Sequence, residues 1–343
     1  MKIFILFLTT FLLNSCMKGK KVDLILHNAN IICLDDINTT GEAIAIKDGK
    51  IVEIGPERQI LNKYRAEEIN DVKGREIVPT FYNSFLELDS EVNYSYLRKM
   101  EIKHLEQGFT EVFVHNITYN QLQILLKFST KMELVWHVNL TPSSNNISFT
   151  RNYKFKKTSK LQIQGFTLSK NELKEISEAC AVAKSKNLQI GINFKEVKSY
   201  LSTILKTLND YKKDHRWYVF NLDDNDINSL KKLEENNFFI LLNESNHINR
   251  PLFVFGTYQS SNSIFLNLSN YTKNNRLDYI KSLKSISNWA SYLSFTEVEF
   301  GTLQKGKYAN FSILETPIST TSNYNAIYSN ATYIKGKKIY SME

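Results

Sequence analysis

An aromatic residue and a carboxylate, Phe85 and Glu87, are the first pair of residues to consider for chemistry. The stretch Pro79–Leu88 has the pattern of a buried strand, and Phe85 and Glu87 stand two residues apart within it. Side chains at positions i and i+2 of a strand point to the same face, so this pair would face one site. Glu87 could bind a cation or transfer a proton, whereas a phenyl ring can do neither. The pair is therefore an incomplete catalytic set.

Other side chains could complete such a set. His115 and His137 lie near two expected strands and could meet Glu87, and Glu244 and His247 lie in a later loop that could also approach. A lone histidine in a strand is more often packed or solvated than a metal ligand, so these residues are alternatives and not the main prediction. The sequence contains no serine-hydrolase, Walker or dinucleotide-binding motif.

Strand and helix patterns alternate through the middle of the chain. The expected strands are Glu111–His115, Met132–Asn139, Leu188–Asn193, Trp217–Leu222, Phe238–Leu242 and Pro251–Gly256. The expected helices are Tyr96–Glu106, Tyr119–Phe128, Ser169–Lys186, Val197–Tyr211, Asp226–Asn236 and Leu277–Leu293. Seven or eight such units predict an α/β fold, a (β/α)8 TIM-type barrel of reduced size. The polar stretch Thr141–Lys160 is either a long loop or contains one weak strand, so a fourth strand is not placed.

Both ends of the chain have β character instead. Short strand patterns occupy the region from Val22 to Val78, where Asp48-Gly49 predicts a type I′ hairpin turn because both positions tolerate positive φ. Strand patterns return after Glu297. The order is therefore a β unit, a barrel and a second β unit.

This order and five local motifs resemble the amidohydrolase superfamily of metal-dependent hydrolases. The motifs are Asp23–Ile31, Ala43–Ile51, Pro79–Leu88, Gly108–Val112 and Gly301–Asn310. Residues 165–173 and 188–190 are similar to the YtcJ-like branch, although its large insertion after the first barrel strand is absent. The resemblance implies a small composite β-sandwich from residues 22–78 and 297–343, beside a degenerate barrel of residues 79–296.

The resemblance also indicates where metal ligands would stand. In that family an H-x-H motif, two further histidines and an aspartate hold a divalent metal, zinc or another ion. The matching positions here are Phe85, Glu87, Asn193, Asn221 and Tyr258. Neutral amides are poor zinc ligands, phenylalanine is none, and a tyrosine with a pKa of about 10 is a poor base. We therefore expect no metal and no other cofactor, and no confident catalytic residue.

The N-terminal residues 1–16 have the pattern of a bacterial lipoprotein signal. Lys2 precedes the apolar run Ile3–Leu13, and Leu13-Asn14-Ser15-Cys16 resembles a lipobox. We expect cleavage before Cys16, lipidation of that residue and a membrane partner through the lipid anchor. Met17 as the next residue favours the outer over the inner membrane of the cell envelope. An ordinary secretory signal with an incidental cysteine is the alternative.

Charge and cysteine content limit the binding partners and the covalent links that we expect. The 343-residue chain carries a net charge of +8, but no basic block is interleaved with aromatic residues, so no nucleic-acid partner is expected. Cys33 and Cys180 have no C-x-x-C spacing, and two buried thiols are expected, with a disulfide left open for an exported protein.

The functional prediction is an amidohydrolase-like envelope lipoprotein that has lost metal-dependent hydrolysis. Such a pseudoenzyme would have a binding or structural role, with a small-molecule or protein ligand at the barrel mouth. One alternative is an active hydrolase of non-peptide C–N bonds, with a site rebuilt from Glu87 and His115 or His137. A second alternative is an envelope assembly partner without a ligand pocket. The sequence specifies neither the ligand nor the oligomeric state.

Overall fold

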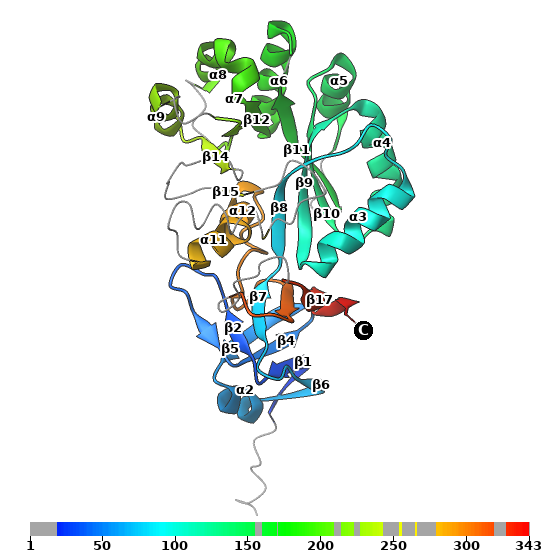
Figure 1. Ribbon diagram of the computed structural model, residues 1–343, viewed down its shortest axis with the longest axis vertical. Coiled ribbons are helices and arrows are strands. Elements are labelled where there is room, and N and C mark those ends of the chain that lie inside the picture. Colours follow the sequence, from blue (N-terminus) through cyan, green and yellow to red (C-terminus); the bar gives the residue numbers. More distant parts are fainter. Residues whose placement is uncertain are drawn as a thin grey trace, which may run out of the picture.

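A barrel stands on a sandwich of two β-sheets in the computed structural model of the chain (Figure 1). The structure describes residues 19–154, 160–169, 171–208, 214–222, 227–242, 254–255, 265, 279–318 and 327–342. The predicted fold class, an α/β barrel with separate sheets from the chain ends, is confirmed.

The sandwich combines strands from both ends of the chain. One sheet has the order β5-β4-β1-β6, with β1 Lys20–His27, β4 Ala43–Lys47, β5 Lys50–Gly55 and β6 Tyr64–Asp71. The other has the order β18-β17-β16-β7-β2-β3, with β2 Asn30–Ile32, β3 Thr40–Gly41, β7 Glu76–Pro79, β16 Phe311–Leu314, β17 Ser329–Ile334 and β18 Lys337–Ser341. The antiparallel pairing of Ser312 with Val78 joins the two ends of the chain.

The residue types of the turn account for the β4–β5 hairpin. Asp48 and Gly49 both adopt positive φ in the hairpin turn, as the sequence predicts.

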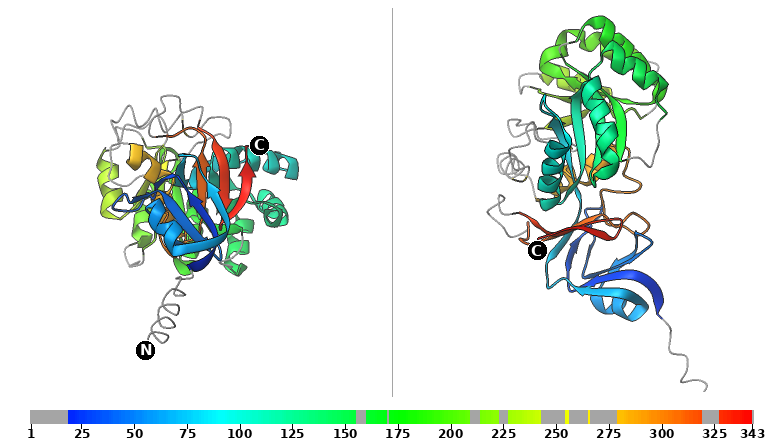
Figure 2. Two further views of the ribbon diagram at one scale, coloured as in Figure 1. Left: turned by 90° about the horizontal axis from the view of Figure 1, so that it is seen from below. Right: turned by 90° about the vertical axis from the view of Figure 1, so that its right-hand side faces the viewer.

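The barrel contacts the sandwich through β17. Figure 2 shows β17 and β18 lying between the barrel and the four-stranded sheet. The Thr332 hydroxyl of β17 donates to the carbonyl of Leu105, at 2.9 Å, so the barrel is attached to the sandwich by a buried hydrogen bond.

Eight parallel strands make the barrel, and sequential strands are neighbours throughout. They are β8 Phe81–Glu87, β9 Phe109–Ile117, β10 Val135–Leu140, β11 Leu161–Leu168, β12 Gln189–Asn193, β13 Tyr218–Phe220, β14 Phe239–Leu242 and β15 Val254–Phe255. Backbone positions of β15 lie within 8 Å of β8, so the sheet nearly closes. Parallel strands direct all their carboxyl ends to one mouth.

Helices cover the outside of the sheet. They are α3 Tyr94–Glu106, α4 Tyr119–Phe128, α5 Ser144–Asn152, α6 Leu173–Lys186, α7 Phe194–Val197, α8 Leu201–Leu208, α9 Ile227–Glu235 and α11 Tyr279–Ser285, and the sandwich adds α2 Glu57–Lys63. Helix α12, Asn288–Leu293, instead packs Ala290 and Leu293 into the interior cluster of the barrel. Side-chain caps fix several starts: Asn93 accepts from the Tyr96 amide, and Thr118 forms a capping box with Gln121. Among the described residues, none of the helices is both long and apolar enough to cross a membrane.

Four expectations need correction. The single helix expected at Val197–Tyr211 is replaced, within the described residues, by α7, a 3-10 turn at Lys198–Tyr200 and α8. The polar stretch before Lys160 contains helix α5, because the Ser143 side chain caps it at the Asn146 amide, and the unplaced strand is β11, immediately afterwards. The single helix expected at Leu277–Leu293 is two helices, since the backbone leaves the helical region at Ser287. The helix expected from Ser169 begins at Leu173.

Cys33 and Cys180 are buried free thiols, as predicted. Burial raises the pKa of each to about 12. The signal residues, including Cys16, lie outside the described part of the chain.

Candidate functional site at the barrel mouth

An aromatic cluster fills the barrel below its mouth. Phe85 is fully buried, and its ring stacks on the imidazole of His115 with centroids 4.3 Å apart and planes within 12°. The Phe220 ring lies 4.9 Å from Phe85 and 6.0 Å from His115, so the three rings form one cluster. The register of β8 against β9 shifts between Asn83 and Leu86, which brings Phe85 into the same interior cluster as Tyr82. Phe85 therefore occupies interior space as a packed hydrophobic side chain.

Hydrogen bonds fix the tautomer of His115. Its Nε2 lies 3.1 Å from the carbonyl oxygen of Ser84, which can only accept, so Nε2 carries the proton. Nδ1 is then an acceptor, and the hydroxyl of Tyr218 donates to it at 2.9 Å. Asn139 in turn donates to the Tyr218 hydroxyl oxygen. Complete burial lowers the pKa of His115 to about 4, so the imidazole is neutral at pH 7.

His137 belongs to a different layer, deeper in the barrel. Its Nδ1 accepts from the side-chain amide of Gln164 at 2.8 Å, so its protonated Nε2 donates to Glu111, also at 2.8 Å. Burial raises the pKa of Glu111, and the bond to His137 opposes that shift. The other carboxylate oxygen of Glu111 has no hydrogen-bond partner in the part of the chain that the structure describes.

Two amides meet at the ends of β12 and β13. The Asn221 amide nitrogen donates to the Asn193 side-chain oxygen at 3.2 Å, and both residues are half-buried. Asn221 has a φ of 57°, a left-handed conformation that asparagine tolerates better than most residues. The two positions thus come together at the mouth, as their places on neighbouring parallel strands require.

Glu87 lies at the rim of the same mouth. It is exposed, and its carboxylate accepts from the Asn116 side-chain amide at 2.6 Å. It stands opposite His115 in the strand register, but His115 uses both ring nitrogens on Ser84 and Tyr218. Of the other predicted positions, Tyr258, Glu244 and His247 lie outside the described residues.

The sequence interpretation did not identify Glu111, Asn139, Gln164 or Tyr218. Glu111 could have been found, because it stands four residues before His115 and alternate residues of a strand share a face. Tyr218 gave no such signal, since its partner is 103 positions away in the chain.

The donor set at the mouth does not fit a divalent metal. Within the described ranges, no group of three or more histidine, cysteine, aspartate or glutamate side chains is placed to hold an ion. Phe85 offers no lone pair, and Asn193 and Asn221 offer neutral amides, which are poor ligands for zinc. No step of a metal-dependent reaction can be derived from these residues.

Comparison with known proteins places the fold. No family model matches the sequence, and no curated protein matches it. Among solved structures, an adenosine deaminase from Xanthomonas campestris with bound zinc is 12% identical, with a TM-score of 0.70 and 94% of each chain covered. An E. coli guanine deaminase is 13% identical, with a TM-score of 0.67 over 93% of this chain and 100% of that one.

An L-hydantoinase from Arthrobacter aurescens is 12% identical, with a TM-score of 0.65 over 93% of this chain and 96% of that one. These coverages extend over barrel and sandwich together. The resemblance inferred from the sequence motifs is therefore confirmed at the level of architecture. The chain has the fold of the amidohydrolase superfamily, a parallel barrel with a β-sandwich built from both chain ends.

Proposed function

We propose that this chain has lost metal-dependent hydrolysis of C–N bonds and acts as a binding or structural protein of the bacterial cell envelope. The observation that carries the proposal is the packing of Phe85 against both His115 and Phe220, at a strand position where the family resemblance implies a metal ligand. A catalytic zinc site needs about three protein ligands with available lone pairs and an open position for water. A fully buried phenyl ring supplies neither.

The hydrogen bonds of the two interior histidines argue against a rebuilt site. His115 has one lone pair, and the Tyr218 hydroxyl donates to it. His137 likewise accepts from Gln164 and is held by Glu111 in the deeper layer. To bind an ion beside Glu87, either imidazole would have to give up the hydrogen bond that its Nδ1 accepts, which is worth about 0.5–1.5 kcal/mol net.

Metal analysis tests this proposal directly. Protein purified without chelator is expected to carry well under one equivalent of zinc, manganese, iron or cobalt, and to leave adenosine, guanine and hydantoin unhydrolysed. Stoichiometric metal that disappears in Glu87→Ala would refute the proposal. Glu67→Ala is the matched control, because Glu67 is an exposed carboxylate on the sandwich, 75% exposed, and its loss should change neither measurement.

The envelope location rests on the Leu13–Cys16 lipobox. We expect the mature chain to begin at a lipidated Cys16 and to fractionate with membranes, preferentially the outer membrane. Mass spectrometry of the N-terminal peptide measures the acyl chains, and Cys16→Ser should release the protein from the membrane fraction. An unmodified mature N-terminus would favour the ordinary secretory signal.

A further inference from the structure

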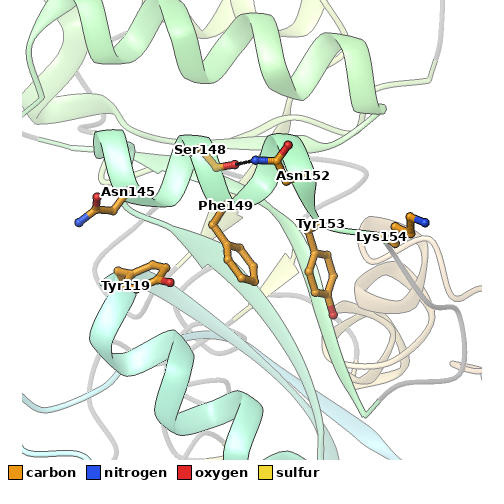
Figure 3. Close-up of a pocket in the computed structure, with 7 residues that line it drawn as sticks. All are labelled: Tyr119, Asn145, Ser148, Phe149, Asn152, Tyr153 and Lys154. Carbon is orange, nitrogen blue, oxygen red and sulfur yellow. Dashed lines mark hydrogen bonds between the residues drawn. The ribbon is translucent and has the colours of Figure 1, made fainter.

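A cavity of about 500 Å³ opens on the outside of the barrel between α4 and α5 (Figure 3). Its size lies within the range of about 300–1,000 Å³ typical of small-molecule sites. Residues of the aromatic cluster under the barrel mouth do not line it. The side chains that do include Tyr119, Asn145, Ser148, Phe149, Asn152 and Tyr153.

Three aromatic rings form its apolar wall. Phe149 and Tyr153 are four residues apart on one face of α5 and at its end, and Figure 3 shows their rings side by side. Their centroids are 5.3 Å apart and their planes differ by 28°, so the two rings are offset-stacked, with one partly over the other. The ring of Tyr119, at the start of α4, stands 6.0 Å from Phe149 at 71° and bounds this stacked pair at one end.

Polar groups surround the rings. Asn145 and Asn152 bring side-chain amides and Ser148 brings a hydroxyl, all from exposed positions of α5. The Asn152 amide nitrogen donates to the carbonyl of Ser148 at 3.1 Å, which holds that side chain along the helix. Lys154 adds one cation, and the lining residues that the structure describes include no carboxylate.

We propose that this cavity binds a short uncharged oligosaccharide. A pyranose ring has an apolar face of C–H groups, which can lie on an open ring face of the stacked Phe149–Tyr153 pair, and a rim of hydroxyls, which amide and hydroxyl side chains can bond. A single-stranded nucleic acid would need a row of cations along its phosphates, and the described lining residues include one lysine. A purely apolar ligand would leave the amide rim unused.

The site is separate from the barrel mouth, so the inference does not depend on whether hydrolysis has been lost. The inference names uncharged oligosaccharides as the class of ligand. It also places the binding site in the α4–α5 cavity, whereas the sequence analysis expected it at the barrel mouth.

Titration of the purified chain with chitotetraose, cellotetraose and maltotetraose, followed by calorimetry and saturation-transfer NMR, tests the proposal. At least one of the three should bind, with saturation passing from aromatic protons to the sugar. Tyr119→Ala should weaken binding at least fivefold. Tyr94→Ala is the matched control, because Tyr94 also begins a helix and is 39% exposed, compared with 37% for Tyr119, but does not line the cavity.

Asn145→Trp provides a second variant, since it adds bulk at an exposed helical position and should block the cavity without removing a packed ring. Failure of all three sugars to bind would refute the proposal. So would sugar binding that both Tyr119→Ala and Asn145→Trp leave unchanged, or binding that oligothymidine displaces.

Discussion

Replacing Phe85 by alanine should both destabilise the barrel and release the neighbouring histidine. The Phe85 side chain has no solvent exposure and packs against two rings, so its removal leaves a cavity in the interior cluster. Phenylalanine-to-alanine changes in cores cost about 3–5 kcal/mol. We expect a loss of that size in the free energy of unfolding, measured by urea denaturation.

The same change should raise the pKa of His115. Its pKa is held at about 4, against an ordinary value of 6.5, mainly because burial disfavours the charged imidazolium. Without the stacked phenyl ring, water can reach the imidazole from the mouth, and the pKa should move back toward 6.5. NMR titration of the His115 ring protons measures this shift.

Phe81→Ala is the matched control for that experiment. Phe81 is a fully buried phenylalanine on the same strand, but it packs against Phe109 in the cluster outside the barrel interior. It should cost similar stability and leave the His115 pKa at about 4. If Phe85→Ala costs under about 1 kcal/mol, or leaves that pKa unchanged, Phe85 does not seal the mouth as its packing indicates.

Three other outcomes follow from the buried polar groups. Burial lowers the pKa values of His104 and His115 from 6.5 to about 4, so in acid the unfolded chain takes up protons that the native chain cannot. The free energy of unfolding should therefore fall between pH 6.5 and pH 5, by about 2 kcal/mol per histidine. Denaturant titration at each pH measures this fall, which should be shallower in His104→Gln. Tyr218→Phe should cost about 0.5–1.5 kcal/mol in the same assay, because Nδ1 of His115 and the Asn139 amide lose their shared partner while the Thr167 hydroxyl, 3.4 Å from Nδ1, keeps one hydrogen bond there; an unchanged free energy of unfolding would contradict a stabilising role for the Tyr218 hydroxyl. Gly191→Ala should cost about 1–3 kcal/mol, since its Cβ would collide with the Tyr218 ring, and Tyr218→Phe should relieve little of that cost because the ring carbons also collide.

Local patterns predicted those parts of the fold that local chemistry determines. The Asp48-Gly49 turn followed from its residue types, and the hairpin it joins was found where expected. Helix α5 was missed because six of its nine residues are asparagine, serine or threonine, which have low helix propensity. Its stability depends on the Ser143 cap and on the burial of Ile147 against the barrel, which is a tertiary effect.

The interior of the barrel also depends on tertiary contacts that local sequence patterns do not predict. The sequence indicated that Phe85, Asn193 and Asn221 would gather at the strand ends, because equivalent positions on parallel strands converge. It did not indicate how the polar interior is satisfied. The partners of His115 and His137 come from strands far apart in the chain, and no spacing rule connects Tyr218 to a histidine 103 positions earlier.

Asn193 and Asn221 satisfy each other without a metal ion. In the family resemblance these positions match two histidines, each of which would offer a lone pair to an ion. Here the Asn221 amide donates to the Asn193 side-chain oxygen, and both side chains are neutral. The buried His115 beneath the mouth is neutral as well, because burial lowers its pKa to about 4. A single histidine placed at Asn193 or Asn221 would remove one member of the amide pair and take this hydrogen bond from the other, so one such substitution would not by itself assemble a set of metal ligands.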